Sequence, residues 1–148
     1  MQLQSSLYEK DFYLWIEQIV TSLQKKQFQD LDLDNLITEL ESMGKREKRE
    51  LISRLFILIE HLLKLQYWET EKEDNARGWK NTVIEQRKQI EILFRESPSL
   101  KQFLPELLST TYQDAREVFL RKSELSETTV PVESPFTLKT ILDPNYFP

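Results

Sequence analysis

The chain contains no cysteine and only one histidine among its 148 residues. The absence of cysteine excludes disulfide bonds, cysteine nucleophiles, and thiolate-ligated zinc or iron–sulfur sites. It also fits a reducing compartment, and we expect a cytoplasmic protein. A single histidine, His61, cannot supply the two Glu-x-x-His pairs of a di-iron helical bundle. We therefore expect no metal site and no cofactor.

The sequence also lacks a surplus of basic charge and a long apolar run. It has 20 basic and 25 acidic residues and a net charge of −5, whereas a general nucleic-acid binder usually carries a basic footprint. The most apolar run covers residues 55–59, far short of the roughly 20 residues of a membrane span. No basic segment leads into an apolar stretch at the start, so we expect no secretory signal, no membrane association and no nucleic-acid partner.

Glycine occurs only twice, as Gly44 and Gly78, which leaves no glycine-rich phosphate loop. The abundant Leu, Glu, Gln and Lys residues all tolerate helix. No sustained strand-like alternation is present before the tail. The sequence therefore predicts an all-α fold: a single compact helical bundle of about five main helices, with a short C-terminal helix packed on it. We expect one domain over residues 1–148, with an N-terminal extension over 1–6 and a C-terminal arm over 125–148.

Apolar spacings of three and four residues predict the helices. A first helix is expected over 7–26, and a second follows Asp32 or Asp34 and ends at Gly44, which suits the left-handed position after a helix. A third, central helix is expected over 45–68 because its apolar residues cover more than one face. The acidic segment 69–76 is expected to be a loop. Further helices are predicted over 77–95, 98–103, 105–122 and 135–142.

His61 and Arg87 are polar residues set into apolar helical stripes. His61 could act as a general base with Glu60 or Lys64 beside it, but a hydrogen-bonded core histidine is favoured. Arg87 could build an anion or ligand site, although a buried ion pair with Glu39 or Glu41 is favoured. The only catalytic constellation that can be drawn therefore joins Glu39, His61 and Arg87.

Other candidate features have simpler structural interpretations. The three tryptophans, Trp15, Trp68 and Trp79, could form an aromatic ligand box, but core packing is favoured. The basic turn at 45–49 could bind phosphate, but spacing of four residues pairs Glu50 with Arg54, which favours a solvated charged face. The acidic segment 69–76 lacks the pattern of a calcium loop.

Several motifs in order along the chain resemble those of a known family. The motifs are Leu31-Asp32-Leu33-Asp34-Asn35-Leu36, Glu39-Leu40-Glu41-Ser42-Met43-Gly44, and His61-Leu62-Leu63-Lys64 with Gln66-Tyr67. They continue with Trp79 and Arg87, Ser97-Pro98-Ser99-Leu100, Tyr112 with Ala115-Arg116, and the closing segment 135–148. From Tyr8 onward the chain resembles the bacterial domain-of-unknown-function family twenty-nine. The resemblance implies an all-α protein of a kind common in cyanobacteria, without an established activity.

The chain departs from the family pattern at two positions. Thr38 stands where members often have a further Glu, which weakens a carboxylate cluster. Ser134 replaces a frequent Cys before Pro135, so a family-wide reactive site is not expected at this position.

Two functional hypotheses from different classes follow. The preferred one is a non-catalytic helical module that docks another protein or a second copy of itself, because apolar residues are in surplus and catalytic groups are scarce. The alternative is a small enzyme or ligand-binding domain with a pocket around Glu39, His61 and Arg87.

Overall fold

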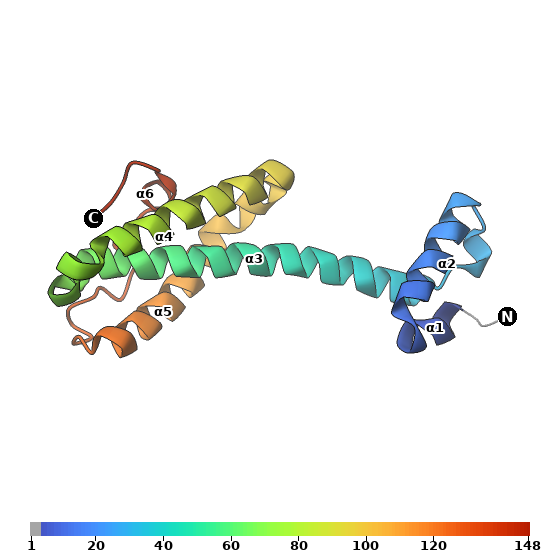
Figure 1. The fold of residues 1–148 in the computed structure, drawn as a ribbon, viewed down its shortest axis with the longest axis horizontal. Coiled ribbons are helices and arrows are strands. Elements are labelled where there is room, and N and C mark those ends of the chain that lie inside the picture. Colours follow the sequence, from blue (N-terminus) through green and yellow to red (C-terminus); the bar gives the residue numbers. More distant parts are fainter. Residues whose placement is uncertain (1–3) are drawn as a thin grey trace. The chain divides into compact units, whose positions relative to one another are not determined.

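The computed structural model describes residues 4–148, and within this range all regular structure is helical. The helices are, in order, α1 (Gln4–Lys10), α2 (Phe12–Gln24), the 3-10 helix η1 (Phe28–Asp30), α3 (Leu33–Tyr67), α4 (Glu69–Glu96), the 3-10 helix η2 (Pro98–Phe103), α5 (Leu104–Ser123) and α6 (Leu138–Leu142) (Figure 1). The predicted all-α class is confirmed. Contacts group the chain into two units, which we call the N-terminal unit (1–46) and the C-terminal unit (47–148). That the chain forms one domain stays a prediction.

The start of the chain differs from the expected extension and single helix. Residues 4–6 belong to α1, while residues 1–3 of the expected extension lie outside the described part. Asp11 separates α1 from α2 because its backbone leaves the helical region, at φ −150° and ψ 85°. Its carboxylate accepts the N–H of Leu14 at 3.1 Å, which satisfies one of the unpaired donors of the first turn. A continuous helix over 7–26 was therefore wrong.

The predicted end of a helix at Gly44 was also wrong, because α3 runs without a break from Leu33 to Tyr67. Gly44 does not take a positive φ, and a side chain there would meet no atom within 4 Å. A glycine costs a helix only about 1 kcal/mol relative to alanine. The flanking Glu, Met, Lys and Arg residues favour helix, so the helix continues through it.

Residues 69–76 form the first two turns of α4 rather than a loop. The segment contains neither glycine nor proline, and Glu69 and Glu71 lie in the first turn, where the helix dipole favours negative charge. The acidic composition that indicated a loop instead suits a helix N-terminus.

The later helices lie close to their predicted bounds. Residues 98–103 form a 3-10 helix, and α5 begins one residue before Pro105. The last helix starts at Leu138, three residues later than expected, because Thr137 and Thr140 form a reciprocal capping box at its N-terminus.

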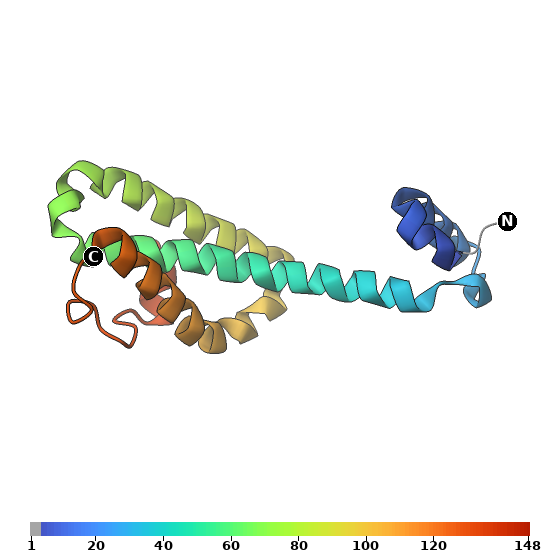
Figure 2. The same cartoon turned by 90° about the horizontal axis from the view of Figure 1, so that it is seen from below.

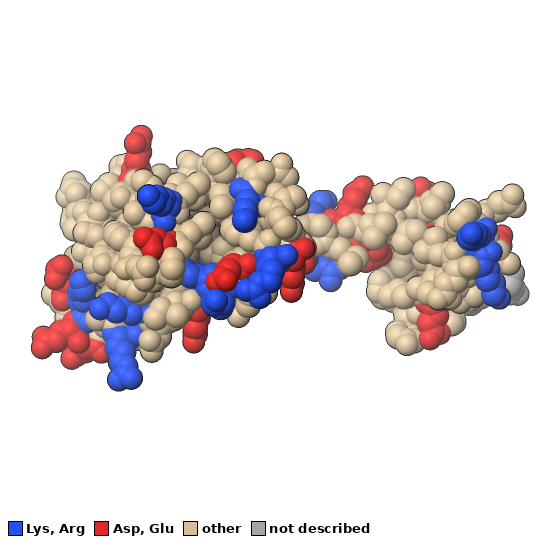
Figure 3. Space-filling view, turned by 90° about the horizontal axis from the view of Figure 1, so that it is seen from above, with Lys and Arg blue, Asp and Glu red and all other residues tan. Residues whose placement is uncertain are grey.

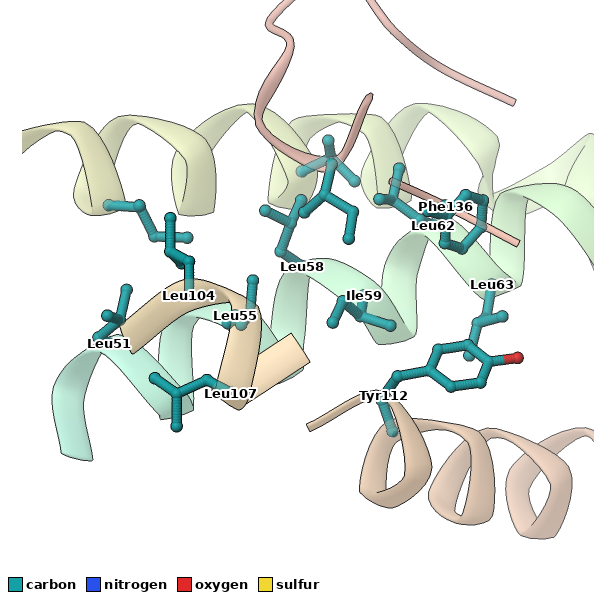
Figure 4. Packing of buried hydrophobic residues seen from close by; sticks show 14 of the residues in the cluster. Leu51, Leu55, Leu58, Ile59, Leu62, Leu63, Leu104, Leu107, Tyr112 and Phe136 are labelled. Carbon is teal, nitrogen blue, oxygen red and sulfur yellow. The ribbon is translucent and has the colours of Figure 1, made fainter. Parts of the chain in front are cut away.

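In the C-terminal unit, α3 lies between α4 and α5 in both ribbon views (Figures 1 and 2). The core of the C-terminal unit is apolar. The side chains labelled in Figure 4 come from α3, α5 and the C-terminal arm. Leu55, Leu58, Ile59, Leu62 and Leu63 of α3 are fully buried. Phe136 and Ile141 of the arm belong to the same cluster, so the predicted packing of the C-terminal helix is confirmed.

The N-terminal unit has a much smaller core, made by Leu7, Trp15 and Ile19. A polar network connects its elements: the Trp15 indole N–H donates to Asp32 at 3.1 Å, and the Asp32 N–H donates to Gln4 at 3.0 Å. The Gln4 amide in turn donates to Ser22 at 2.8 Å. These bonds hold α1, α2 and the start of α3 to one another.

Candidate functional site

His61 lies on α3 and is half-buried. Its Nδ1 is 2.8 Å from the Ile57 carbonyl. A carbonyl can only accept, so Nδ1 carries the proton and the neutral ring leaves Nε2 unprotonated. Burial is the main cause that lowers the pKa of His61, and nearby Lys64 and Lys122 lower it further. The imidazole is therefore neutral at pH 7 and satisfies a backbone carbonyl of its own helix.

Beside His61 lies a buried carboxylate with two ammonium neighbours. Glu60 is 4% exposed, and its Oε1 lies 2.6 Å from Nζ of Lys122 and 3.8 Å from Nζ of Lys64. Burial lowers the pKa of Lys64. Sequence reasoning found Glu60 and Lys64 as neighbours of His61 but missed Lys122, which comes from the last turn of α5. The arrangement joins α3 to α5 through a charge-assisted hydrogen bond.

Arg87 is 6% exposed and donates to backbone carbonyl groups of the C-terminal arm. Its Nε donates to the Ile141 carbonyl at 2.8 Å and its Nη2 to the Thr140 carbonyl at 3.1 Å. These carbonyls lie at the C-terminal end of α6, where a helix has unpaired acceptors and negative partial charge. The Phe147 ring lies 5.2 Å from the guanidinium carbon. The guanidinium thus caps the C-terminal helix. The ion pair with Glu39 or Glu41 would join the two units and stays a prediction.

Glu39 belongs to the N-terminal unit, where its Oε1 accepts the Tyr8 hydroxyl at 2.5 Å. This hydrogen bond is the main cause that raises the pKa of Tyr8. The groove lined by Arg87 includes neither Glu39 nor His61. The three candidate residues thus have different hydrogen-bond partners. Glu39 accepts from a tyrosine hydroxyl, His61 bonds a carbonyl of its own helix, and Arg87 donates to carbonyl groups of α6.

The tryptophans fall into two clusters. Trp68 and Trp79 stack with ring centres 5.8 Å apart, and Phe119 packs edge-on against Trp68. Trp15 contacts Tyr8 and Phe12 in the N-terminal unit. Trp15 is buried in the smaller hydrophobic core, and Trp68 and Trp79 are partly buried against the larger one. Core packing is the structural interpretation favoured from the sequence.

The basic turn at 45–49 is part of a charged helical surface. Lys48 lies over the Phe103 ring at 4.4 Å, and Arg54 pairs with Glu50 at 3.7 Å. Figure 3 shows basic and acidic side chains interspersed on one face of the molecule. Within residues 4–148 no group of three or more histidine, aspartate and glutamate side chains could hold a metal ion.

The N-terminal unit exposes much of its apolar surface. Of the thirteen large apolar side chains that are exposed among the described residues, eleven lie between positions 12 and 43, with exposed fractions of 38% to 72%. We call this set the N-terminal apolar face: Phe12, Tyr13, Leu14, Ile16, Val20, Leu23, Phe28, Leu33, Ile37, Leu40 and Met43. Figure 3 shows a broad area of this unit without charged side chains.

Helical spacing places part of this face on one side of α3, where Leu33, Ile37 and Leu40 succeed one another at intervals of four and three. Apolar residues with helical spacing also include Phe12, Ile16 and Leu23 of α2, and these side chains are 38% to 45% exposed. Periodicity shows that a helix has an apolar side, but it does not show that this chain covers that side.

The described residues form an all-α protein, and its longest helix, α3, has 35 residues. The family model described as "Domain of unknown function DUF29" matches residues 7–147. The chain therefore belongs to this family, as its motifs indicated. No curated protein matches the chain, and no solved structure matches it. Among residues 4–148, no helix is at once long enough and apolar enough to cross a membrane.

Proposed function

We propose that the protein is a non-catalytic, cytoplasmic interaction module that associates with a second copy of itself through the N-terminal apolar face. The observation that carries the proposal is the concentration of exposed apolar side chains in residues 12–43. Extended apolar patches on soluble proteins mark interaction sites.

The total apolar area exposed by residues 12–43 is comparable in size to one side of a specific dimer interface. The eleven side chains together expose on the order of 1,000 Å² per copy, taking a typical large apolar residue as roughly 200 Å² when fully exposed. A specific protein–protein interface buries about 800 Å² on each partner.

The small core of the N-terminal unit supports the same proposal. Only Leu7, Trp15 and Ile19 are buried in its hydrophobic cluster. Units of this size bury a small fraction of their surface and are marginally stable without additional burial. An apolar partner surface would remove the exposed face from water at about 25 cal/mol per Å².

A second copy is favoured as the partner because residues 47–148 expose too few apolar side chains to cover the N-terminal apolar face. Among large apolar side chains of residues 47–148, only Ile84 and Val132 are exposed. Residues 12–43 of another copy offer an apolar surface of equal size, as a two-fold interface requires.

Size-exclusion chromatography with light scattering tests this proposal with two variants, each of which replaces an exposed apolar side chain by glutamate. Leu40→Glu places a charge on the N-terminal apolar face, at a residue 57% exposed, and we expect it to yield monomers. Val132→Glu is the matched control at a residue 66% exposed in the C-terminal unit, and we expect it to remain dimeric. Equal masses for both variants would contradict the location of the interface.

The alternative, a ligand pocket shared by Glu39, His61 and Arg87, lacks a supporting observation in the structure. Arg87 lines a groove of sufficient size, and neither Glu39 nor His61 lines that groove. Its surroundings point to a different ligand site that does not involve the other two residues.

A further inference from the structure

A groove of about 540 Å³ opens in the C-terminal unit between α4, η2 and the C-terminal arm. Small-molecule sites typically have volumes of about 300–1,000 Å³. Its apolar surface comes from Ile84, Ile90 and Phe94 of α4 and from Leu142 and Pro144 of the arm. The groove can therefore accept an apolar group.

The charged residues along the groove are predominantly basic. Arg87, Lys88, Arg95 and Lys101 line it, against one acidic residue, Glu91. Glu91 pairs with Lys88 at 2.8 Å and with Arg95 at 3.3 Å. A local surplus of positive charge in a chain of net charge −5 attracts anions to this position. We call this site the cationic groove.

Arg87 provides a second, independent observation. Its Nε and Nη2 are bound by carbonyl groups, but its Nη1 is buried and has no hydrogen-bond partner among the described residues. Asp143 acts on the guanidinium through space, yet no carboxylate lies within ion-pair distance of it in the described part of the chain. The charge of this guanidinium has no carboxylate paired with it among these residues and therefore adds to the positive potential of the groove.

We propose that the cationic groove binds a small amphipathic organic anion, with its charged head beside Lys101 and Arg95 and its apolar body along Phe94 and Leu142. Lys101 is placed for this role, since its Nζ lies 5.7 Å from the centre of the Phe94 ring. It thus presents a cation at the border of an apolar wall. All residues of the site belong to 47–148, whereas the N-terminal apolar face is made of residues 12–43.

The head group that fits is a carboxylate or a phosphate monoester, since both accept charge-assisted hydrogen bonds from Lys and Arg. Isothermal titration with dodecanoate and with dodecyl phosphate, each kept below the concentration at which it forms micelles, distinguishes the two. Dodecyltrimethylammonium has the same apolar chain with a positive head group, so it tests whether the chain alone is enough for binding. Inorganic phosphate tests whether an anion without a chain is enough. We expect binding of at least one dodecyl anion, with neither the dodecyl cation nor inorganic phosphate binding measurably.

Three variants locate the site. Lys101→Glu is expected to weaken binding of the dodecyl anion about fivefold or more. Glu91→Gln is expected to strengthen it about threefold, because Lys88 and Arg95 lose their carboxylate partner. Arg121→Glu makes the same charge change as Lys101→Glu, at a side chain that is 82% exposed on α5 and does not line the groove. It should leave binding unchanged.

Several results would overturn the proposal. One is that the dodecyl cation or inorganic phosphate binds as tightly as the dodecyl anions. Another is that Lys101→Glu and Arg121→Glu change the affinity for the dodecyl anion by the same factor. The absence of heat with both dodecyl anions at millimolar concentration would also overturn it. Circular dichroism of each variant confirms that the fold is retained.

Discussion

The ammonium of Lys122 lies 2.6 Å from the buried Glu60 carboxylate, although the two residues are 62 positions apart in the chain. Glu60 exposes 5% of its side chain and Lys122 exposes 51%. The pair thus joins the C-terminal part of α3 to the end of α5 at the border of the core.

Replacing Lys122 by alanine is expected to lower the free energy of unfolding by about 1.5–3 kcal/mol, since it removes a hydrogen bond between charged groups and leaves a buried carboxylate with only Lys64 nearby. Urea unfolding followed by tryptophan fluorescence measures the change. Arg121→Ala is the neighbouring control: its pair with Glu117 is exposed, so we expect a change within about 0.5 kcal/mol. Equal losses in the two variants would show that the Glu60 pair has no special role.

The pH dependence of stability should contain a contribution from His61. Because burial lowers its pKa in the folded state below the usual 6.5, the unfolded chain binds more protons as the pH falls through that range. Its contribution to the free energy of unfolding is therefore complete above pH 6.5 and is lost as the pH falls toward the folded-state pKa. His61→Gln should remove this part of the pH dependence.

A proton NMR titration tests directly whether the pKa of His61 is lowered in the folded protein. His61 is the only histidine, so its ring gives a single set of signals without further assignment. We expect a midpoint below 6.5. A midpoint at or above 6.5 would mean that the ring is solvated or paired with Glu60.

Continuity of α3 through Gly44 predicts the effect of Gly44→Ala. A side chain at this position meets no atom within 4 Å, and alanine favours helix over glycine by about 1 kcal/mol. We expect higher helical content by circular dichroism and stabilisation of about 0.5–1 kcal/mol. Destabilisation would indicate the left-handed conformation that the sequence suggested. Gly78→Ala, within α4, should behave in the same way.

Arg87→Met is expected to release the C-terminal helix, because two carbonyl groups at the end of α6 lose their donors. We predict a loss of about 2 kcal/mol or more in the free energy of unfolding. Hydrogen exchange should become faster over residues 138–147. Lys88→Met, at the adjacent exposed position, should leave exchange in α6 unchanged. Unaltered exchange in both variants would show that apolar packing alone holds the arm.

The helical class could be predicted because composition and periodicity are local properties of the chain. Helix ends were predicted less well, since a glycine or an acidic run has different effects in different contexts. Gly44 resembles a helix terminus only when the strong helix formers on both sides are ignored. Glu69 and Glu71 resemble a loop only when their favourable interaction with a helix N-terminus is ignored.

The partners of Arg87 could not be predicted from pairing rules. Its acceptors are backbone carbonyl groups more than fifty positions away, and every residue has such a group. The pattern showed that a cation interrupts an apolar stripe, but not what compensates it. The N-terminal apolar face illustrates the same limit, because its stripes could be identified while their exposure depends on the tertiary structure.

Sedimentation equilibrium of the unaltered protein over a wide concentration range tests the proposed self-association most directly. We expect the mass to approach twice the 17.8 kDa of one chain as the concentration rises, since apolar surface in residues 12–43 becomes buried between copies. A mass of 17.8 kDa at every concentration would contradict the proposal.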